Sequence, residues 1–541
     1  MSQKTYNEIY SKNDAEPVSI RLQRGLNKVA NAVKSTLGPA GNTVLIDRKY
    51  LGTATTKDGV TVAKSITLKD DVENIAATMI KQVAAKAVDE AGDGTTTATI
   101  LAQAIYNEGL KVLPYVKNRN DLKRAIECYS KQVVERIKMS ATPILFEKGV
   151  PSPELFNIAK ISANGDSEMA QAIVDAFNVV GKEGIISVDD GVTEGYVVER
   201  VDGLKVDAGI AHPYFISDMR KLECEQNKPF VLLVKDGLDS FQPIIPVLEM
   251  VGQQGKSIAI FSDNFNEQVI ELALANRMKA KLDICLIKVQ GYGANKDGIF
   301  EDIAALTGAT PLDKMTKPED LMNCVGKADK IIANKNETNI IASEKDDVKF
   351  QEHISMLQTK LETEVNNTNK EKIETRISKL LGGVATIKVS KATAEEVHEA
   401  KDRLDDAINA VRAALEEGYV AGAGSVFNRI SYELVDDGTM TDGYRVITEA
   451  LRAPLKTLCE NSGVSYEYIK QLPEIKMINY GIDFSIDNTV VMPTDLTLSG
   501  IIDPTKVLRV ALESAVSIAN LLLTSDNVIT TVEVGNEDQN M

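Results

Sequence analysis

Residues 91–97 read Ala91-Gly92-Asp93-Gly94-Thr95-Thr96-Thr97. Apolar residues recur at helical spacing before this segment, and a second helix is predicted to begin near Thr96. Glycines let backbone amides approach an anion, a helix N-terminus carries partial positive charge, and the threonines add hydroxyl donors. The segment therefore has the chemistry of a phosphate cradle, although a polar helix cap is the simpler interpretation. Asp93 would need a cation to face phosphate, which makes it a candidate Mg²⁺ ligand.

Segments far from residues 91–97 carry related chemistry. They are Thr36-Leu37-Gly38-Pro39 at the end of a predicted helix, Thr56-Lys57-Asp58-Gly59, the helical pair Asp405-Asp406 leading to Ala421-Gly422-Ala423-Gly424, and Asp503 before Pro504. Each segment alone is more simply interpreted as a turn or a solvated helix face. Spacing in the sequence does not show whether these segments converge.

The organisation of the chain is helical at both ends and mixed in the middle. Between Pro229 and Val289, apolar runs alternate with helical stretches, which predicts an α/β domain with parallel strands. Residues 354–380 are predicted to form a charged helical hairpin, and helical periodicity returns from Glu395. The α/β block is therefore predicted to be inserted between two helical halves. Gly203 and Gly382-Gly383 are candidate hinges.

Composition excludes several classes of function. The 541 residues have 78 acidic and 61 basic side chains, a formal charge of −17, which disfavours binding to nucleic acid or anionic membranes. Five dispersed cysteines and three separated histidines argue against zinc sites and histidine triads, and favour a reducing compartment. Residues 1–17 do not resemble a secretory signal, and no apolar run is long enough to span a membrane. We expect a bacterial-type cytoplasmic protein.

Taken in order, several strings resemble the group I chaperonins, from about Leu22 to Ile529. The strings are Thr36–Pro39, Thr56–Val60, Gly92–Thr99, Ile161–Asn164, Leu381–Ala385 and Asp503–Val507. The resemblance implies a multidomain α and α/β protein with a discontinuous helical equatorial ATPase domain, a small intermediate hinge domain and an inserted apical α/β domain. The implied boundaries are residues 1–139 with 417–541, 140–201 with 385–416, and 202–384 respectively.

The resemblance also implies a site for ATP and Mg²⁺, with K⁺ as a further cation. Asp406 would be the catalytic carboxylate that orients the attacking water, Asp58 would complete the polar site, and Asp93 would hold Mg²⁺. The implied nucleotide contacts are Thr36, Leu37, Gly38, Pro39, Lys57, Asp93, Gly94, Thr95, Thr96, Thr97, Gly422, Ala423, Asp483, Phe484, Ser485 and Asp503, the last of these at the ribose.

For partners, the resemblance implies unfolded or partly folded proteins, a homo-oligomer of heptameric rings, and a small co-chaperonin lid. The apolar positions that would bind unfolded chains are Tyr214, Phe215, Ile245, Leu248, Ile270, Leu274 and Ala275. Without the resemblance, these residues would be interpreted as ordinary core.

Departures from the family pattern leave other hypotheses open. Ala423 replaces the middle of three glycines, and Asp483-Phe484-Ser485 replaces an Asn-Ala-Ala run at the adenine pocket. A methyl group at a close approach would crowd a nucleotide, whereas Phe484 offers a stacking surface. A passive scaffold that holds unfolded chains without effective ATP cycling is therefore the alternative. A small-molecule kinase is disfavoured because no acceptor pocket is identifiable. The acidic C-terminal tail, residues 534–541, is expected to be disordered. A fast-evolving or virally encoded lineage would account for such divergence.

Overall fold

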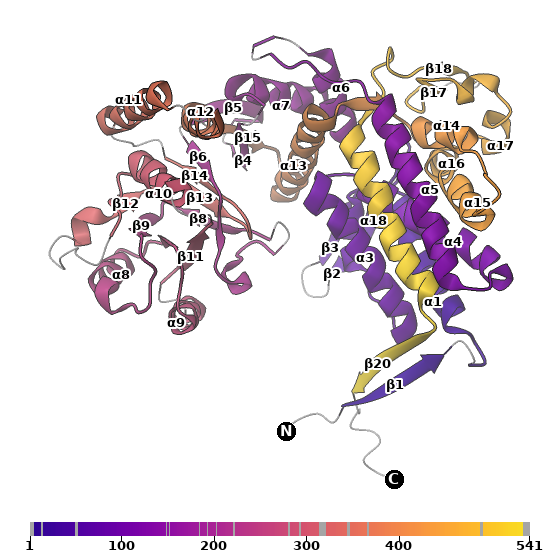
Figure 1. The fold of residues 1–541 in the computed structure, drawn as a ribbon, viewed down its shortest axis with the longest axis horizontal. Coiled ribbons are helices and arrows are strands. Elements are labelled where there is room, and N and C mark those ends of the chain that lie inside the picture. The colour runs from indigo at the N-terminus through magenta and orange to yellow at the C-terminus, as the bar shows by residue number, and fades with distance from the viewer. Residues whose placement is uncertain are drawn as a thin grey trace. The chain divides into compact units, whose positions relative to one another are not determined.

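A computed structural model describes residues 5–533 except 12–13, 49–51, 148, 151, 183, 192, 202, 220–221, 280–281, 291–293, 313–320, 343–346, 365–366, 383 and 487–490. The chain forms two compact units. The helical unit comprises residues 1–174 and 390–541, and the α/β unit comprises residues 175–389 (Figure 1). This division agrees with an α/β block inserted between two helical halves. The separate hinge domain and its boundaries stay a prediction.

Five long helices form the core of the helical unit, and they run side by side in Figure 1. They are α1 (Val18–Lys34), α3 (Asp71–Ala91), α4 (Thr95–Val112), α5 (Arg119–Ser140) and α18 (Thr505–Thr524). Leu22, Leu26, Val29 and Val33 of α1 are fully buried, as the helical spacing predicts. Aliphatic side chains fill most of this core, consistent with a chain that has no tryptophan.

The remaining elements complete the helical unit. Its other helices are α2 (Gly59–Ser65), η1 (Leu113–Tyr115), α6 (Pro153–Ser162), α13 (Ala394–Glu417), α14 (Ser425–Glu433), α15 (Thr441–Ala450), α16 (Ala453–Asn461), α17 (Tyr466–Ile469) and η5 (Pro473–Lys476), while α7 (Ser167–Val180) crosses the unit boundary. Four antiparallel strand pairs are β1 (Thr5–Ser11) with β20 (Asn527–Glu533), β2 (Val44–Arg48) with β3 (Gly52–Thr56), β16 (Tyr419–Ala421) with β19 (Ile502–Pro504), and β17 (Tyr480–Ile482) with β18 (Pro493–Asp495).

The α/β unit contains the predicted parallel strands. β9 (Phe230–Val234), β10 (Ile258–Ser262) and β11 (Ile284–Val289) are mutually parallel, and β12 (Gly326–Lys327) and β7 (Ala208–Ile210) flank them in the order β12-β9-β10-β11-β7. A second sheet has the order β6-β14-β13-β8, formed by β6 (Gly203–Val206), β14 (Thr338–Ile341), β13 (Lys330–Ala333) and β8 (Cys224–Asn227). A third has the order β4-β15-β5, formed by β4 (Ile185–Asp190), β15 (Val384–Ser390) and β5 (Gly195–Val201).

Helices cover these sheets, and two of them form the predicted hairpin. The helices are η2 (Pro213–Phe215), η3 (Gln242–Ile244), α8 (Ile245–Gln253), α9 (Glu267–Met278), α10 (Ala294–Thr307), η4 (Leu321–Cys324), α11 (Asp347–Thr363) and α12 (Asn367–Gly382). The hairpin of α11 and α12 is therefore confirmed. Gly203 lies within β6, where a Cβ atom would be 2.2 Å from Cγ2 of Val384, so close packing explains this glycine. Gly383 and the tail of residues 534–541 lie outside the described residues.

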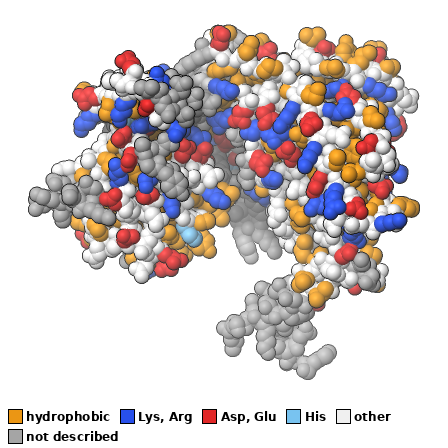
Figure 2. All heavy atoms as spheres, viewed as in Figure 1, with side chains coloured by type: hydrophobic (Ala, Val, Ile, Leu, Met, Phe, Trp, Pro, Cys, Tyr) orange, Lys and Arg blue, Asp and Glu red, His pale blue; other side chains and the backbone are white. Residues whose placement is uncertain are grey.

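Two features bear on whether the protein contacts a membrane or a polyanion: one apolar helix and the distribution of surface charge. Among the described residues, α18 alone is long and apolar enough to cross a membrane, but 67% of its apolar window is buried, as in a core helix. Figure 2 shows acidic and basic side chains interspersed on the visible face of the helical unit. The net negative charge is therefore not gathered into one patch on that face.

Candidate functional site

The segment that carries Asp93 is a tight connection between two long helices. α3 ends at Gly92, whose φ is 73°, and α4 begins after Gly94, whose φ is 86°. Both values lie in the left-handed region, where glycine is favoured. The Asp93 carboxylate accepts hydrogen bonds from the Gly94 amide and, at 3.0 Å, from the Ser162 hydroxyl. The predicted helix, glycine turn and second helix are confirmed.

Four aspartates from separate segments form one cluster in the helical unit, here called the four-aspartate site: Asp58, Asp93, Asp406 and Asp503. The charges of Asp93 and Asp58 both act on the Asp406 carboxyl, and the charge of Asp93 acts on Asp503. The backbones also approach closely, because a Cβ atom at Gly92 would lie 2.2 Å from Cβ of Asn409 on α13. The structure thus brings together four residues that sequence spacing left unconnected.

Burial and mutual repulsion raise the pKa of three carboxyls of this cluster, those of Asp93, Asp406 and Asp503. Burial, followed by the neighbouring Asp93 and Asp58, raises the pKa of Asp406 well above its usual value. Burial and the charge of Asp58 raise the pKa of Asp93, against the lowering effect of its hydrogen bonds. Burial and Asp93 raise the pKa of Asp503 to about 7. The concentration of negative charge makes the site receptive to a cation.

The segments predicted to bind phosphate lie around these carboxylates. Asp58 caps α2 by accepting hydrogen bonds from the amides of Val60 and Thr61, at 3.0 and 2.7 Å. A Cβ atom at Gly59 would lie 2.5 Å from Oγ1 of Thr96 and 3.3 Å from Cγ1 of Val33, near the end of α1. The N-termini of α2 and α4 are therefore adjacent. Thr95 is buried, and Thr97 is partly buried.

The loop after α1 reaches the same region. Thr36 and Leu37 are partly buried, whereas Gly38, Pro39 and Lys57 are exposed. Gly38 has a φ of 81°, and the Asn461 side chain donates hydrogen bonds of 2.9 Å to the carbonyls of Lys34 and Leu37. These bonds fix the loop against α16.

The loop that carries Gly422 and Ala423 meets Asp503 across the β16–β19 pair. A Cβ atom at Gly422 would lie 3.0 Å from Oδ1 of Asp503, so any larger residue would press on this carboxylate and displace it by a few tenths of an ångström. Ala423 adopts a φ of 53°, and its side chain packs against the core of the helical unit. The methyl group thus has a packing contact, and the residue carries the strain of a left-handed backbone.

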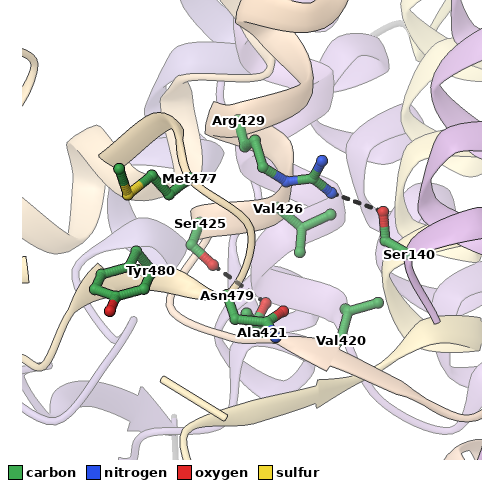
Figure 3. A pocket seen from close by; sticks show the side chains of 9 residues that line it. All are labelled: Ser140, Val420, Ala421, Ser425, Val426, Arg429, Met477, Asn479 and Tyr480. Carbon is green, nitrogen blue, oxygen red and sulfur yellow. Dashed lines mark hydrogen bonds between the residues drawn. The ribbon is translucent and has the colours of Figure 1, made fainter. Parts of the chain in front are cut away.

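A small cavity lies behind this loop, shown in Figure 3. Its volume of about 10 Å³ suits one water molecule and is far too small for a nucleotide. The Ser425 hydroxyl donates to the Gly422 carbonyl at 2.7 Å, and Nη2 of Arg429 donates to the Ser140 hydroxyl at 2.7 Å. The first bond holds the loop to α14, and the second joins α14 to α5. The cavity is lined by Ser140, Val420, Ala421, Ser425, Val426, Arg429, Met477, Asn479 and Tyr480.

Ala423→Gly is expected to stabilise the nucleotide-free protein by about 0.5–1 kcal/mol. Relief of left-handed strain is worth about 1–2 kcal/mol, and the extra freedom of glycine in the unfolded chain offsets part of it. Ala421→Gly is the matched control, because Ala421 is buried in β16, and it should destabilise by a similar amount. Urea denaturation measures both. Equal losses of stability in the two variants would contradict the strain at Ala423.

The predicted adenine-pocket segment follows β17. Asp483 accepts hydrogen bonds from the amide and hydroxyl of Ser485, at 2.8 and 2.5 Å, which closes a tight turn. Phe484 is partly buried against a small cluster that includes Leu455 and Ile482. A Cβ atom at Gly481 would lie 3.0 Å from Cβ of Ser425, so this turn is next to the Gly422 loop. Phe484 is therefore anchored by packing.

Two residues of the site were not predicted as site residues. Ser162 ends α6 and donates to Asp93, and Asn409 lies one turn after Asp406 on α13. A signal for Asn409 was available, since residues three apart share a helix face. Ser162 lies within a string that resembles the family, but its role depends on a tertiary contact.

The raised pKa of Asp503 predicts a loss of stability with rising pH. Its carboxyl titrates near 4 when unfolded and at about 7 when folded, so its contribution is complete below about 4 and is lost as pH rises to about 7. Each unit of pKa shift is worth roughly 1.4 kcal/mol, so the upper limit of the stability lost across this range is on the order of 4 kcal/mol. Asp503→Asn should flatten the dependence of the urea midpoint between about pH 4 and 7 without nucleotide. An identical slope in both proteins would contradict this assignment.

The predicted client-binding positions are exposed to different degrees. Tyr214 is 76% exposed and Ile245 is 37% exposed, whereas Leu248, Ile270, Leu274 and Ala275 are partly buried. The prediction that Phe215 binds unfolded chains is wrong. Its side chain is 0% exposed within the core of the α/β unit and cannot be presented to a client. Neighbouring exposed apolar residues that were not predicted are Met219, Leu222, Leu272 and Met278.

The carboxylates of the four-aspartate site suit a metal ion that arrives with a nucleotide. Among the described residues, no group of three or more His, Cys, Asp or Glu side chains is arranged to hold a metal. A hydrated Mg²⁺ that binds with a nucleotide takes only one or two carboxylates plus phosphate oxygens. Asp93, among repelling carboxylates and beside the N-terminus of α4, fits that requirement.

A helical unit interrupted in sequence by an α/β unit, with carboxylates from four separate segments gathered in the helical unit, is the architecture of a chaperonin. The chain belongs to the TCP-1/cpn60 chaperonin family, whose model matches residues 29–533.

Two solved structures share this fold. Both are of the chaperonin gp146 from the bacteriophage EL 2 (Pseudomonas aeruginosa), in the presence of ATP-BeFx. Crystal form II has 22% identity and a TM-score of 0.67, and the match covers 96% of this chain and 98% of that chain. Crystal form I has 21% identity and a TM-score of 0.60, covering 98% and 99%. At this identity, the likeness concerns the fold.

Proposed function

We propose that this protein is an ATP-dependent chaperonin, a ring subunit that captures non-native proteins and promotes their folding through ATP binding and hydrolysis. The convergence of Asp58, Asp93, Asp406 and Asp503 from four separate segments carries this proposal. The related structures with ATP-BeFx support nucleotide binding. The reducing cytoplasm remains the proposed location.

In the proposed reaction, the chain's own residues position the nucleotide and the attacking water. Amides and hydroxyls at the start of α4 and in the loop after α1 bind phosphates with Lys57, and Asp503 binds the ribose. Bound Mg²⁺, held by Asp93, would supply charge neutralisation at the phosphates. Asp406 orients the water and accepts its proton. Because Asp93 and Asp58 raise the pKa of Asp406, it ionises more readily once a cation balances them. K⁺ is proposed as a further cation on family resemblance.

Two strand pairs with unpaired outer edges support ring assembly. The β2–β3 hairpin and the β1–β20 ribbon are each two-stranded, so both have free edges within the described chain. Leu45 on the hairpin is 71% exposed, and the cross-strand partners Ile9 and Ile529 on the ribbon are 69% and 63% exposed. Different apolar edges on one subunit favour head-to-tail contacts that close into a ring. A heptamer and a co-chaperonin lid remain proposals from the resemblance.

The α/β unit is the proposed surface for non-native chains. Exposed Tyr214 and Ile245, with the neighbouring methionines Met219 and Met278, provide adaptable apolar contacts. Repetition of this surface around a ring would give avidity without sequence selectivity. A lid would compete for the same surface.

Electron microscopy with and without ATP tests the proposal. Rings whose subunits change conformation with ATP are the expected result. A monomer unchanged by nucleotide would contradict it. Mg²⁺-dependent phosphate release, measured in parallel, separates it from the passive scaffold, since rings that bind unfolded protein without releasing phosphate would support that alternative.

A further inference from the structure

Two buried cysteines of the α/β unit are in contact. Cys224 lies on β8 and Cys285 on β11, and their side chains interact within one apolar core. Nε2 of Gln226, two residues after Cys224 on β8, donates a 3.1 Å hydrogen bond to the Asp283 carbonyl just before β11, so the two strands approach each other here. Cys224 is 1% exposed and Cys285 is 0% exposed. β8 is in the four-stranded sheet and β11 in the five-stranded sheet, so the contact joins two sheets. Both thiols are free.

A guanidinium group makes the two sulfurs unequal. Nη1 of Arg277 lies 3.7 Å from Sγ of Cys224 and donates a 2.6 Å hydrogen bond to the Phe215 carbonyl. Nε of Arg277 is 3.4 Å from the Asp283 carboxylate. The interaction with Cys285, followed by the charge of Arg277, lowers the pKa of Cys224 against the opposing effect of burial, whereas the interaction with Cys224 and burial raise the pKa of Cys285. Cys224 is thus the better nucleophile, and Cys285 is placed to attack a mixed disulfide formed on Cys224.

The backbone on either side of Cys224 offers a route of access. β8 has four residues and forms the edge of its sheet. Leu222 before it and Lys228 after it have φ values of 57° and 49°. Left-handed backbone is costly for residues other than glycine, and short edge strands open locally at low free energy. Transient opening of β8 would expose Cys224 to a small reagent.

We propose that Cys224 and Cys285 are a modification site at which a small-molecule disulfide oxidises the pair to an intramolecular disulfide between β8 and β11. The Cys224 thiolate attacks one sulfur of the reagent, forming a mixed disulfide and releasing one thiolate. The Cys285 thiol then loses its proton and attacks Sγ of Cys224, releasing the second thiolate. Two protein thiols are oxidised and one reagent disulfide is reduced to two thiols. This inference does not depend on ATP hydrolysis.

The test treats the full-length protein with oxidised glutathione under native conditions. Cys128→Ser is used as the parent because Cys128 is exposed. Intact mass should fall by two hydrogen atoms, and peptide mapping should recover a Cys224–Cys285 link. Cys285→Ser should stop at one glutathione on Cys224. Cys459→Ser is the matched control for a buried thiol and should behave as the parent does, since burial raises the pKa of Cys459 to about 12.

Arg277 variants test the role of the guanidinium. Arg277→Gln should slow the first step by roughly three- to tenfold, and Arg277→Lys should retain most of the rate. The parent result decides the proposal, independently of how well any variant folds. Four thiols remaining in the parent, or glutathione attached to Cys224 that never resolves, would overturn it. Oxidation at Cys459 as fast as at Cys224 would also overturn it.

Discussion

Replacing Asp406 with asparagine is expected to lower the rate of ATP hydrolysis by about 10²- to 10⁴-fold while leaving nucleotide binding nearly unchanged. The amide keeps the shape of the carboxyl but cannot accept the proton of the attacking water. Asp406 belongs to α13, a different element from the turns at Asp58 and Asp93 that are proposed to bind phosphate, so its replacement should leave those turns intact. Single-turnover hydrolysis and equilibrium binding of ATP measure the two effects separately.

The same substitution should raise the stability of the nucleotide-free protein. Burial, followed by the charges of Asp93, Asp58, Asp405 and Asp402, disfavours the ionised form of the Asp406 carboxyl in the folded protein, and a neutral amide avoids that cost. A gain in the urea midpoint together with lost hydrolysis is the signature of a functional carboxylate placed at a cost to stability. Asp402→Asn is the matched control, one turn earlier on α13 and more exposed, and should change hydrolysis by only a few-fold. Unchanged hydrolysis in Asp406→Asn would remove its catalytic assignment.

Helical periodicity and the positions of glycines in the sequence predicted the turn that carries Asp93, because its conformation depends on neighbouring residues. Gly92 and Gly94 both have left-handed φ values, and the helical periodicity on either side places the turn of Asp93 between α3 and α4. The parallel strands β9, β10 and β11 were likewise predictable, since buried strands alternate with helices.

Tertiary packing determined the rest. The hydrogen bond from Ser162 to Asp93 joins residues that are 69 positions apart, and no local pattern requires it. Phe215 follows the exposed Tyr214 in the same short turn but is directed into the core. In a turn without regular periodicity, neither the helical nor the strand repeat indicates which of two adjacent aromatic residues is buried.

Replacing Asp302 with asparagine is expected to destabilise the α/β unit by about 3 kcal/mol. Asp302 lies on α10 and its side chain is only 6% exposed. It accepts hydrogen bonds from Nε and Nη2 of Arg376 on α12, at 2.9 and 2.7 Å, and lies 2.8 Å from Nε2 of His353 on α11. One carboxylate therefore holds both helices of the hairpin against α10.

The size of this effect follows from the charge that remains. Breaking a buried ion pair costs about 3–5 kcal/mol because the surviving charge stays desolvated. The Arg376 side chain is 23% exposed and keeps part of its hydration, so we expect a cost near the lower end of this range. Glu301→Gln is the matched control, since Glu301 contacts the same guanidinium at 3.5 Å from a more exposed position and should cost less than about 1 kcal/mol. Urea denaturation of both variants measures the difference. Equal effects would mean that the hairpin is held by its apolar face alone, since the buried carboxylate would then contribute no more than an exposed one.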